Sequence, residues 1–184
     1  MKKKILIITF FLVLIIVLII GILNTANKEK INEDILLEYS YTNYQTGPNS
    51  YGMILLDDGK IYEYKISTTK KDEEFFNARK DINKRADFVK SIAEYKTQIS
   101  EKDLVDVKNL LKEISDETEK EERLIHDFPS SELLYYNNGE MITIKQSTET
   151  EFVLNKSEKT HEVLKKLNEL GIINTSFMEE ENIF

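Results

Sequence analysis

The longest apolar stretch of the chain begins at Ile5 and ends at Leu23, and it contains no charged residue. At about 1.5 Å per residue, a helix of this length spans roughly 28 Å, which is close to the hydrocarbon thickness of a bilayer. A helix also pairs every backbone group inside lipid, and this outweighs the weak helix preference of the β-branched residues in the stretch. The pattern predicts one transmembrane helix that contacts the lipid bilayer.

Positive charge lies compactly on only one side of this stretch. Lys2, Lys3 and Lys4 precede it, whereas the lysines that follow it are offset by acidic residues. The positive-inside rule therefore predicts the signal anchor of a single-pass cell-membrane protein, with the N-terminus in the cytoplasm and the C-terminal domain outside. Two alternatives stay open, namely a signal peptide that is cleaved before Asn27 and a buried helix of a soluble protein.

These features divide the chain into five parts. Residues 1–4 form a cytoplasmic tip, 5–23 the anchor helix, 24–32 a polar spacer, 33–176 a single extracytoplasmic domain and 177–184 an acidic tail. The outer domain has about the length of one folding unit, and a chain of that size can bury a core without disulfide bonds.

Alternation of apolar and polar side chains predicts β-strands in the outer domain. The expected strands cover residues 35–42, 51–56, 60–66, 133–136, 140–145 and 151–154. Asp57-Asp58-Gly59 and Asn137-Asn138-Gly139 each join two of these strands. An Asp-Gly or Asn-Gly pair in such a place is typical of a hairpin with a type I′ turn, whose two central residues both have positive φ. In the first hairpin, Asp57 and Lys60 are expected to face each other as opposite charges.

Apolar residues at steps of three and four predict amphipathic helices. The first is expected over residues 73–96, with Asp72 as its N-cap. The second is expected to begin at Ser100, with Asp103 as the capping partner three residues on. Residues 115–123 are rich in charge and are expected to form a connector.

A third helix is expected near the end of the outer domain. Ser157 is its expected N-cap and Gly171 its natural terminating residue, since glycine adopts the left-handed conformation that ends many helices. Ile172 is then expected to contact Leu167, as in a Schellman motif.

The order of these elements, β-β-β-α-α-β-β-β-α, predicts an α+β fold. We expect an antiparallel sheet built from two hairpins plus flanking strands, with helices packed on one face, preceded by one transmembrane helix. The two hairpins align without gaps on their glycines, and Tyr62 and Tyr64 then match Ile142 and Ile144. A duplicated unit and shared turn chemistry both explain this match.

Composition excludes several classes of function. The formal net charge is −8, and the chain after the three N-terminal lysines carries −11. Such an acidic domain repels phosphate backbones, so no nucleic acid is expected as a partner. The chain has no cysteine. This excludes disulfides, thiolate metal sites, cysteine nucleophiles and a lipid-modified cysteine.

The residues that often carry chemistry form no recognisable set. His126 lies near Ser130 and Ser131, but no strand–serine–helix elbow surrounds these serines. His161 lies in the first turn of the last expected helix, and no HExxH pair is present. The acidic clusters at 116–122 and 179–181 lack the central glycine of a calcium loop, and no glycine-rich phosphate loop occurs. We therefore predict no catalytic residue, no metal ligand and no cofactor.

Tyrosine is the one residue type whose distribution hints at binding. All nine tyrosines except Tyr95 are expected in strands or adjoining loops. Tyrosine is common in half-buried strands, but exposed rings on a sheet also stack on sugars or anchor a protein partner. Tyr135 and Tyr136 are expected to point to opposite faces of the sheet, because adjacent strand residues alternate.

An anchor, a compact outer domain and no catalytic residue set favour a membrane-tethered extracytoplasmic binding or accessory module with no evident catalysis. Its expected partners are the lipid bilayer, through the segment from Ile5 to Leu23, and another protein or an envelope component. Alternative hypotheses are an envelope hydrolase that uses paired carboxylates and a secreted factor after signal-peptide cleavage. The Lys-, Ile- and Asn-rich composition suggests a bacterial gene.

Overall fold

The computed structural model describes residues 31–43, 49–124 and 129–179. The predicted transmembrane segment that begins at Ile5 and ends at Leu23 lies outside these residues, and so does His126. Within the described ranges, no helix combines the length and apolar character that crossing a bilayer requires. The chain divides into two compact units, of which the second, Asn32–Phe184, contains the fold described below.

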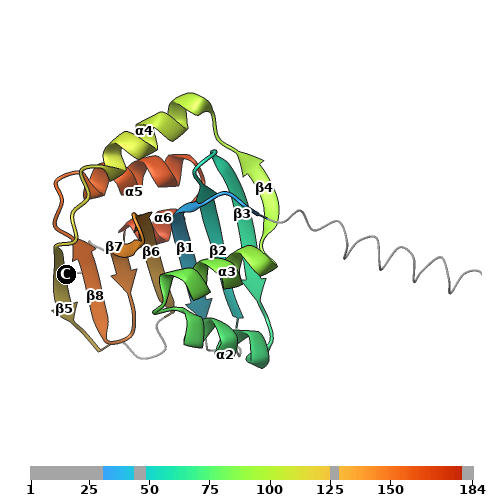
Figure 1. The fold of residues 1–184 in the computed structure, drawn as a ribbon. Helices are drawn as coiled ribbons and strands as arrows, with labels where there is room; N and C mark the ends of the chain where they lie inside the picture. The colour runs from blue at the N-terminus through green and yellow to red at the C-terminus, as the bar shows by residue number, and fades with distance from the viewer. Residues whose placement is uncertain (1–30, 44–48, 125–128, 180–184) are drawn as a thin grey trace, which may run out of the picture. The chain divides into compact units, whose positions relative to one another are not determined.

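The described residues form one eight-stranded antiparallel sheet and five helices, which confirms the α+β class (Figure 1). The sheet order is β4-β3-β2-β1-β6-β7-β8-β5, so β1 and β6 lie in its middle. The strands are β1 (Ile35–Asn43), β2 (Asn49–Leu56), β3 (Lys60–Ile66), β4 (Glu94–Gln98), β5 (Thr118–Glu122), β6 (Ser130–Asn137), β7 (Glu140–Ser147) and β8 (Glu151–Asn155). The helices are α2 (Thr69–Ala78), α3 (Ile82–Ile92), α4 (Glu101–Leu111), α5 (Thr160–Glu169) and α6 (Thr175–Glu179).

The apolar core lies between one face of the sheet and helices α4, α5 and α6. Leu37 and Tyr39 of β1 belong to it, together with Leu111 of α4, Leu164 of α5 and Phe177 of α6. Only 1% of the Phe177 surface is exposed. The core therefore includes a side chain from the segment that the sequence division assigned to an acidic tail.

The opposite face of the sheet carries α2 and α3 (Figure 1). Glu38 of β1 bonds to Arg85 of α3, and the ring of Phe75 on α2 lies 6.3 Å from that of Tyr64 on β3. The expectation of helices on one face is therefore wrong. The polar positions of β1 are buried because these helices cover them.

The predicted helix over residues 73–96 is wrong, because two helices and a strand occupy this region. Thr68, and not Asp72, is the N-cap of α2. The side chain of Asp81 then caps α3 by accepting from the backbone N–H groups of Asn83 and Lys84, both at 3.1 Å. An aspartate that caps a new helix competes with the continuation of the old one.

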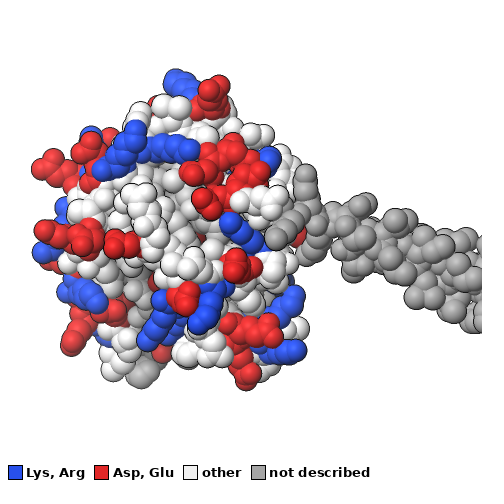
Figure 2. Space-filling model, viewed as in Figure 1, with Lys and Arg blue, Asp and Glu red and all other residues white. Residues whose placement is uncertain are grey.

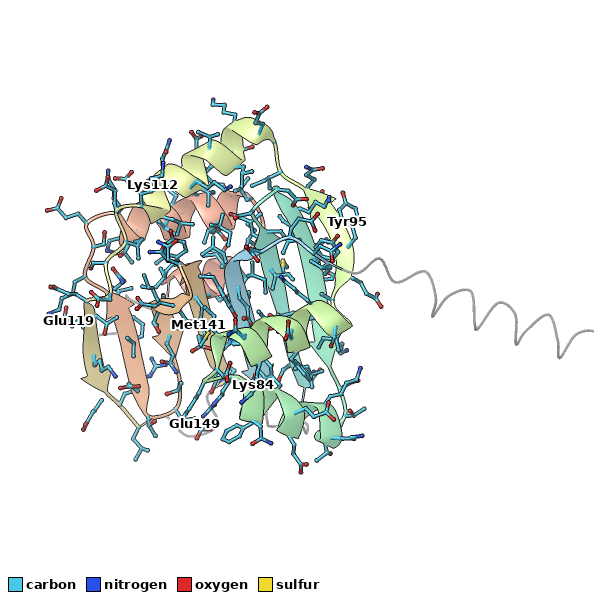
Figure 3. All side chains as sticks on the ribbon, viewed as in Figure 1. Lys84, Tyr95, Lys112, Glu119, Met141 and Glu149 are labelled. Carbon is cyan, nitrogen blue, oxygen red and sulfur yellow. The ribbon has the colours of Figure 1, made fainter. Side chains whose placement is uncertain are left out.

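Two short strands form the edges of the sheet, and the sequence pattern predicted neither. Figure 3 shows labelled Tyr95 on β4 at one edge and Glu119 on β5 at the other. Tyr95 therefore lies in a strand, contrary to expectation, and the expected connector at 115–123 contains β5. Four of the five β5 residues are charged, and this suits an edge strand that must not pair with another chain. The charges also removed the apolar alternation that marks a strand.

The two hairpins differ in their turns. Asn138 and Gly139 have φ values of 48° and 87°, which confirms the type I′ turn of the second hairpin. In the first, Asp58 does not have positive φ, and Gly59 donates its N–H to the Leu56 carbonyl at 2.9 Å. That hairpin has a three-residue loop, so the predicted type I′ turn is wrong there.

The first loop also changes the expected charge pairing and the match between the hairpins. Lys60 pairs with Asp58 at 2.7 Å and not with Asp57. Because one loop is a residue longer than the other, Tyr62 lies on the face opposite to the core, whereas Ile142 lies in the core. The hairpins therefore do not present the same face at the matched positions.

Two of the predicted helix-end signals, at Ser100 and Gly171, are confirmed, and the predicted N-caps Asp72 and Ser157 are wrong. Ser100 Oγ accepts from the Asp103 N–H at 3.1 Å, which confirms the predicted cap of α4. Gly171 has a φ of 68°, and the Ile172 N–H donates to the Leu167 carbonyl at 2.9 Å, which confirms the Schellman motif after α5. The predicted cap of α5 is wrong, because the N-cap position is Lys159. The side chain of Ser157 instead accepts from the Lys159 N–H and donates to the Glu113 carbonyl.

Candidate binding site

A buried ion pair joins α3 to the middle of the sheet. Glu38 of β1 is fully buried and Arg85 of α3 is 2% exposed. Arg85 Nε donates to Glu38 Oε2 at 2.8 Å, and Arg85 Nη2 donates to Glu38 Oε1 at 3.1 Å. This two-point contact fixes both the distance and the orientation of the guanidinium. Burial alone would lower the pKa of Arg85, but the charges of Glu38 and Glu132 outweigh it and raise that pKa, so the group stays charged.

Two phenols complete the hydrogen bonds of this carboxylate. Tyr64 of β3 donates to Glu38 Oε1 at 2.7 Å, and Tyr136 of β6 donates to Glu38 Oε2 at 2.5 Å. Burial, followed by the charge of Glu38, raises the pKa of both tyrosines, so both remain donors. Glu38 therefore accepts four hydrogen bonds from three side chains. We call Glu38, Arg85, Tyr64 and Tyr136 the buried network.

A glycine makes room for one of these phenols. Gly52 of β2 lies opposite Tyr64 in the sheet register. A Cβ atom at Gly52 would lie 2.3 Å from Tyr64 Cζ and 2.5 Å from its hydroxyl oxygen, far inside van der Waals contact. The missing side chain lets the ring cross β2 and reach the carboxylate on β1.

A cavity of about 250 Å³ lies beside the buried network, between α2 and strands β1, β6 and β7. The strands and the residue that follows β7 contribute polar side chains: Ser40, Thr42, Ser130, Ser131, Glu132, Gln146 and Thr148. Helix α2 and the residues after it contribute Asp72, Phe75, Phe76, Arg79 and Lys80. The rings of Phe75 and Phe76 therefore form one wall of the cavity, and groups that donate or accept hydrogen bonds form its floor.

Arg85 links the buried network to this cavity at two points. Its Nη2 atom lies 2.8 Å from Glu132 Oε2, and Glu132 is 26% exposed in the cavity wall. Its Nη1 atom donates to the backbone carbonyl of Arg79 at 3.4 Å. One guanidinium thus holds a carboxylate of the wall and the corner of chain between α2 and α3.

Positive charge collects at this corner. Figure 2 shows Lys and Arg side chains gathered where α2 meets α3, among acidic groups. The Arg79 guanidinium lies 4.1 Å from the centre of the Phe76 ring. Among the residues that the structure describes, no carboxylate lies within ion-pair distance of Arg79 or Lys80. By contrast Lys84, labelled in Figure 3, pairs with Asp81 at 3.1 Å.

The side chains that the sequence singled out lie mostly elsewhere. His161 is exposed on α5, and the structure does not describe His126. Ser130 and Ser131 begin β6 and line the cavity, so the serines lie at the site without a histidine among its lining residues. No metal-binding group of three or more His, Asp or Glu residues occurs in the ranges described.

The tyrosines divide between structural and exposed positions. Tyr135 enters the core and Tyr136 the buried network, so the prediction that they face opposite sides is confirmed. Tyr51 and Tyr95 are 37% and 59% exposed. Sequence reasoning missed Glu38 and Arg85, although each is a charged residue at a position where its element otherwise buries side chains.

Comparisons with known proteins add no assignment to this geometry. No protein-family model matches the sequence, and no curated protein is similar enough to count as a relative.

Proposed function

We propose that this protein is a membrane-tethered extracytoplasmic binding module, and that the cavity between α2 and the sheet is its binding site. The observation that carries the proposal is the cavity itself, which combines two aromatic walls, a polar floor and two cations without carboxylate partners in the described chain. Concave sites with apolar walls and a few placed polar groups are the usual form of ligand sites.

The support beneath the cavity suits binding. Its floor lies on strands and its wall on a helix, and the buried network ties β1, β3, β6 and α3 together. Side chains on helices and strands are positioned more precisely than side chains on loops, so the entropy cost of ordering them when a ligand binds is smaller.

The membrane tether rests on the sequence. An apolar segment from Ile5 to Leu23, with a compact lysine cluster before it and only lysines offset by acidic residues after it, favours insertion with the C-terminal domain outside. The partner is then an envelope component or another protein at the membrane surface.

A hydrolase with paired carboxylates is the alternative. Two acids line the cavity, Asp72 and Glu132. Glu132 is already engaged by Arg85 at 2.8 Å and would have to leave that ion pair to carry a proton. This engagement supports binding over hydrolysis.

Topology is tested with the full chain in membranes. The protein should remain in the membrane fraction after carbonate washing, and a reporter after Phe184 should be active only outside the cytoplasm. A reporter active only in the cytoplasm would contradict the tether and the orientation. A released product that starts near Asn27 would instead identify a secreted factor.

Binding is tested by placing a photoreactive phenylalanine at Phe76, which is 56% exposed and lines the cavity. The matched control places the same residue at Tyr95, which is 59% exposed at the β4 edge. A reproducible cross-linked product from position 76 and not from position 95 is expected. Equal products from both positions, or none from position 76 under any growth condition, would reject the cavity as the site.

A further inference from the structure

We infer that the cavity takes a small hydroxylated monocarboxylate, of the size of one sugar acid, with its carboxylate at Arg79 and Lys80. This inference rests on the proposed function, because it names the ligand of the same site. The argument uses the charge, the size and the lining of the cavity in turn.

The charges of the lining favour a single negative charge on the ligand. Arg85 is already matched by Glu38 and Glu132. The lining itself contains three cations, Arg79, Lys80 and Arg85, and two acids, Asp72 and Glu132, so it carries one more positive charge than negative, whereas Glu38 lies behind it and is not a lining residue. A monocarboxylate neutralises that excess, whereas a dianion such as phosphate would add negative charge beside Asp72 and Glu132.

The geometry of the cations suits a carboxylate. A guanidinium presents paired N–H donors that match the two oxygens of a carboxylate, and an ammonium adds a mobile point charge. The Arg79 group stacks on the Phe76 ring at 4.1 Å, and its backbone carbonyl is held by Arg85. Stacking and the fixed corner both restrict the guanidinium before a ligand arrives, which lowers the ordering cost of binding.

The rest of the lining suits hydroxyl groups and a ring. Ser40 and Thr42 on the floor are 6% and 8% exposed, and Ser130, Gln146 and Thr148 add further donors and acceptors. The faces of aromatic side chains commonly pack against the C–H faces of sugar rings. A volume of about 250 Å³ limits the ligand to about one such ring.

The test is calorimetric titration of the full chain in detergent micelles with D-glucuronate, with D-glucose as the neutral match and inorganic phosphate as the dianion. Glucuronate should bind measurably, and glucose and phosphate should each bind at least tenfold more weakly. Arg79→Gln should weaken glucuronate binding at least tenfold, which is about 1.4 kcal/mol, because it removes a charge-assisted contact to the carboxylate. Lys80→Gln should also weaken glucuronate binding.

Lys84→Gln is the matched control, since it removes one cation from the adjacent helix but outside the cavity lining. It should leave the affinity within about twofold. If Lys84→Gln lowered the glucuronate affinity as much as Arg79→Gln, net charge alone would explain the effect and the inference would be overturned. Phosphate binding as tight as that of glucuronate would also overturn it. Absence of glucuronate binding would also overturn it, while a cross-link from position 76 would show that the site binds another ligand and that the proposed function survives.

Discussion

Replacing Arg85 by methionine should cost this domain a large part of its stability. The substitution keeps an apolar stem of similar length but removes the guanidinium from a fully buried carboxylate. Glu38 would lose two hydrogen bonds, of 2.8 and 3.1 Å, and keep only the two phenols as donors. Breaking a buried ion pair from one side costs about 3–5 kcal/mol, against a total stability of about 5–15 kcal/mol for a typical domain.

The two sides of the pair should be strongly coupled. Glu38→Leu combined with Arg85→Met removes both charges, but it leaves the hydroxyls of Tyr64 and Tyr136 without their acceptor, at about 1–3 kcal/mol each. Adding Tyr64→Phe and Tyr136→Phe removes that cost as well. The fourfold variant should therefore be more stable than Arg85→Met alone.

The assay is urea unfolding of the full chain in detergent micelles, followed by tyrosine fluorescence, since the chain has no tryptophan. Lys84→Met, one position earlier on α3, breaks an exposed ion pair with Asp81 and should change stability by less than about 0.5 kcal/mol. If Arg85→Met costs no more than this control, or if the fourfold variant is the least stable of the series, the reasoning from burial is refuted.

Three further substitutions test other contacts. Gly52→Ala should lower the free energy of unfolding by about 1–3 kcal/mol, because the new methyl group would displace the Tyr64 ring; an unchanged urea midpoint would contradict this. Lys145→Met removes a buried hydrogen bond to a carbonyl of α6, so the amides of α6 should exchange faster with deuterium while those of β1 do not change. Lys166 donates to Asp103 at 2.7 Å and holds the pKa of Asp103 below its usual value. The Lys166–Asp103 ion pair therefore stabilises the fold at neutral pH, and this stabilisation is lost as the pH falls through the lowered pKa of Asp103. Asp103→Asn should lower the free energy of unfolding at neutral pH, and the gap between the variant and the wild type should narrow in acid.

Features that depend on a few neighbouring residues were predictable from the sequence. The Asn138-Gly139 turn, the Ser100 cap and the Gly171 terminus each need only local chemistry, and each is present. The predicted turn type of the first hairpin was wrong because an Asp-Gly pair also fits a three-residue loop. Only the register of the flanking strands decides between the two-residue turn and the three-residue loop.

The site could not be assembled from the sequence, because its parts are far apart along the chain. Arg85 lies between Ile82 and Val89 on the apolar stripe of its helix, and Glu38 lies between two buried strand residues. Each is visible as a charge in an apolar context. The two residues are 47 positions apart in the sequence. They meet only because α3 covers β1, and the sequence pattern did not predict that helices cover both faces of the sheet.

Stability alone does not account for charges in this place. An apolar set of similar volume on α3 and β1 would be as stable or more so, since a buried ion pair pays a desolvation cost that its attraction often does not exceed. Apolar side chains, however, could not form hydrogen bonds to polar groups at the edge of the interior. Arg85 contacts the Glu132 carboxylate and the Arg79 carbonyl, and both belong to the cavity wall. If the cavity binds a carboxylate through Arg79, then Arg85→Met should weaken that binding even though Arg85 is 2% exposed, and a folded Arg85→Met protein with unchanged affinity would separate the buried network from the site.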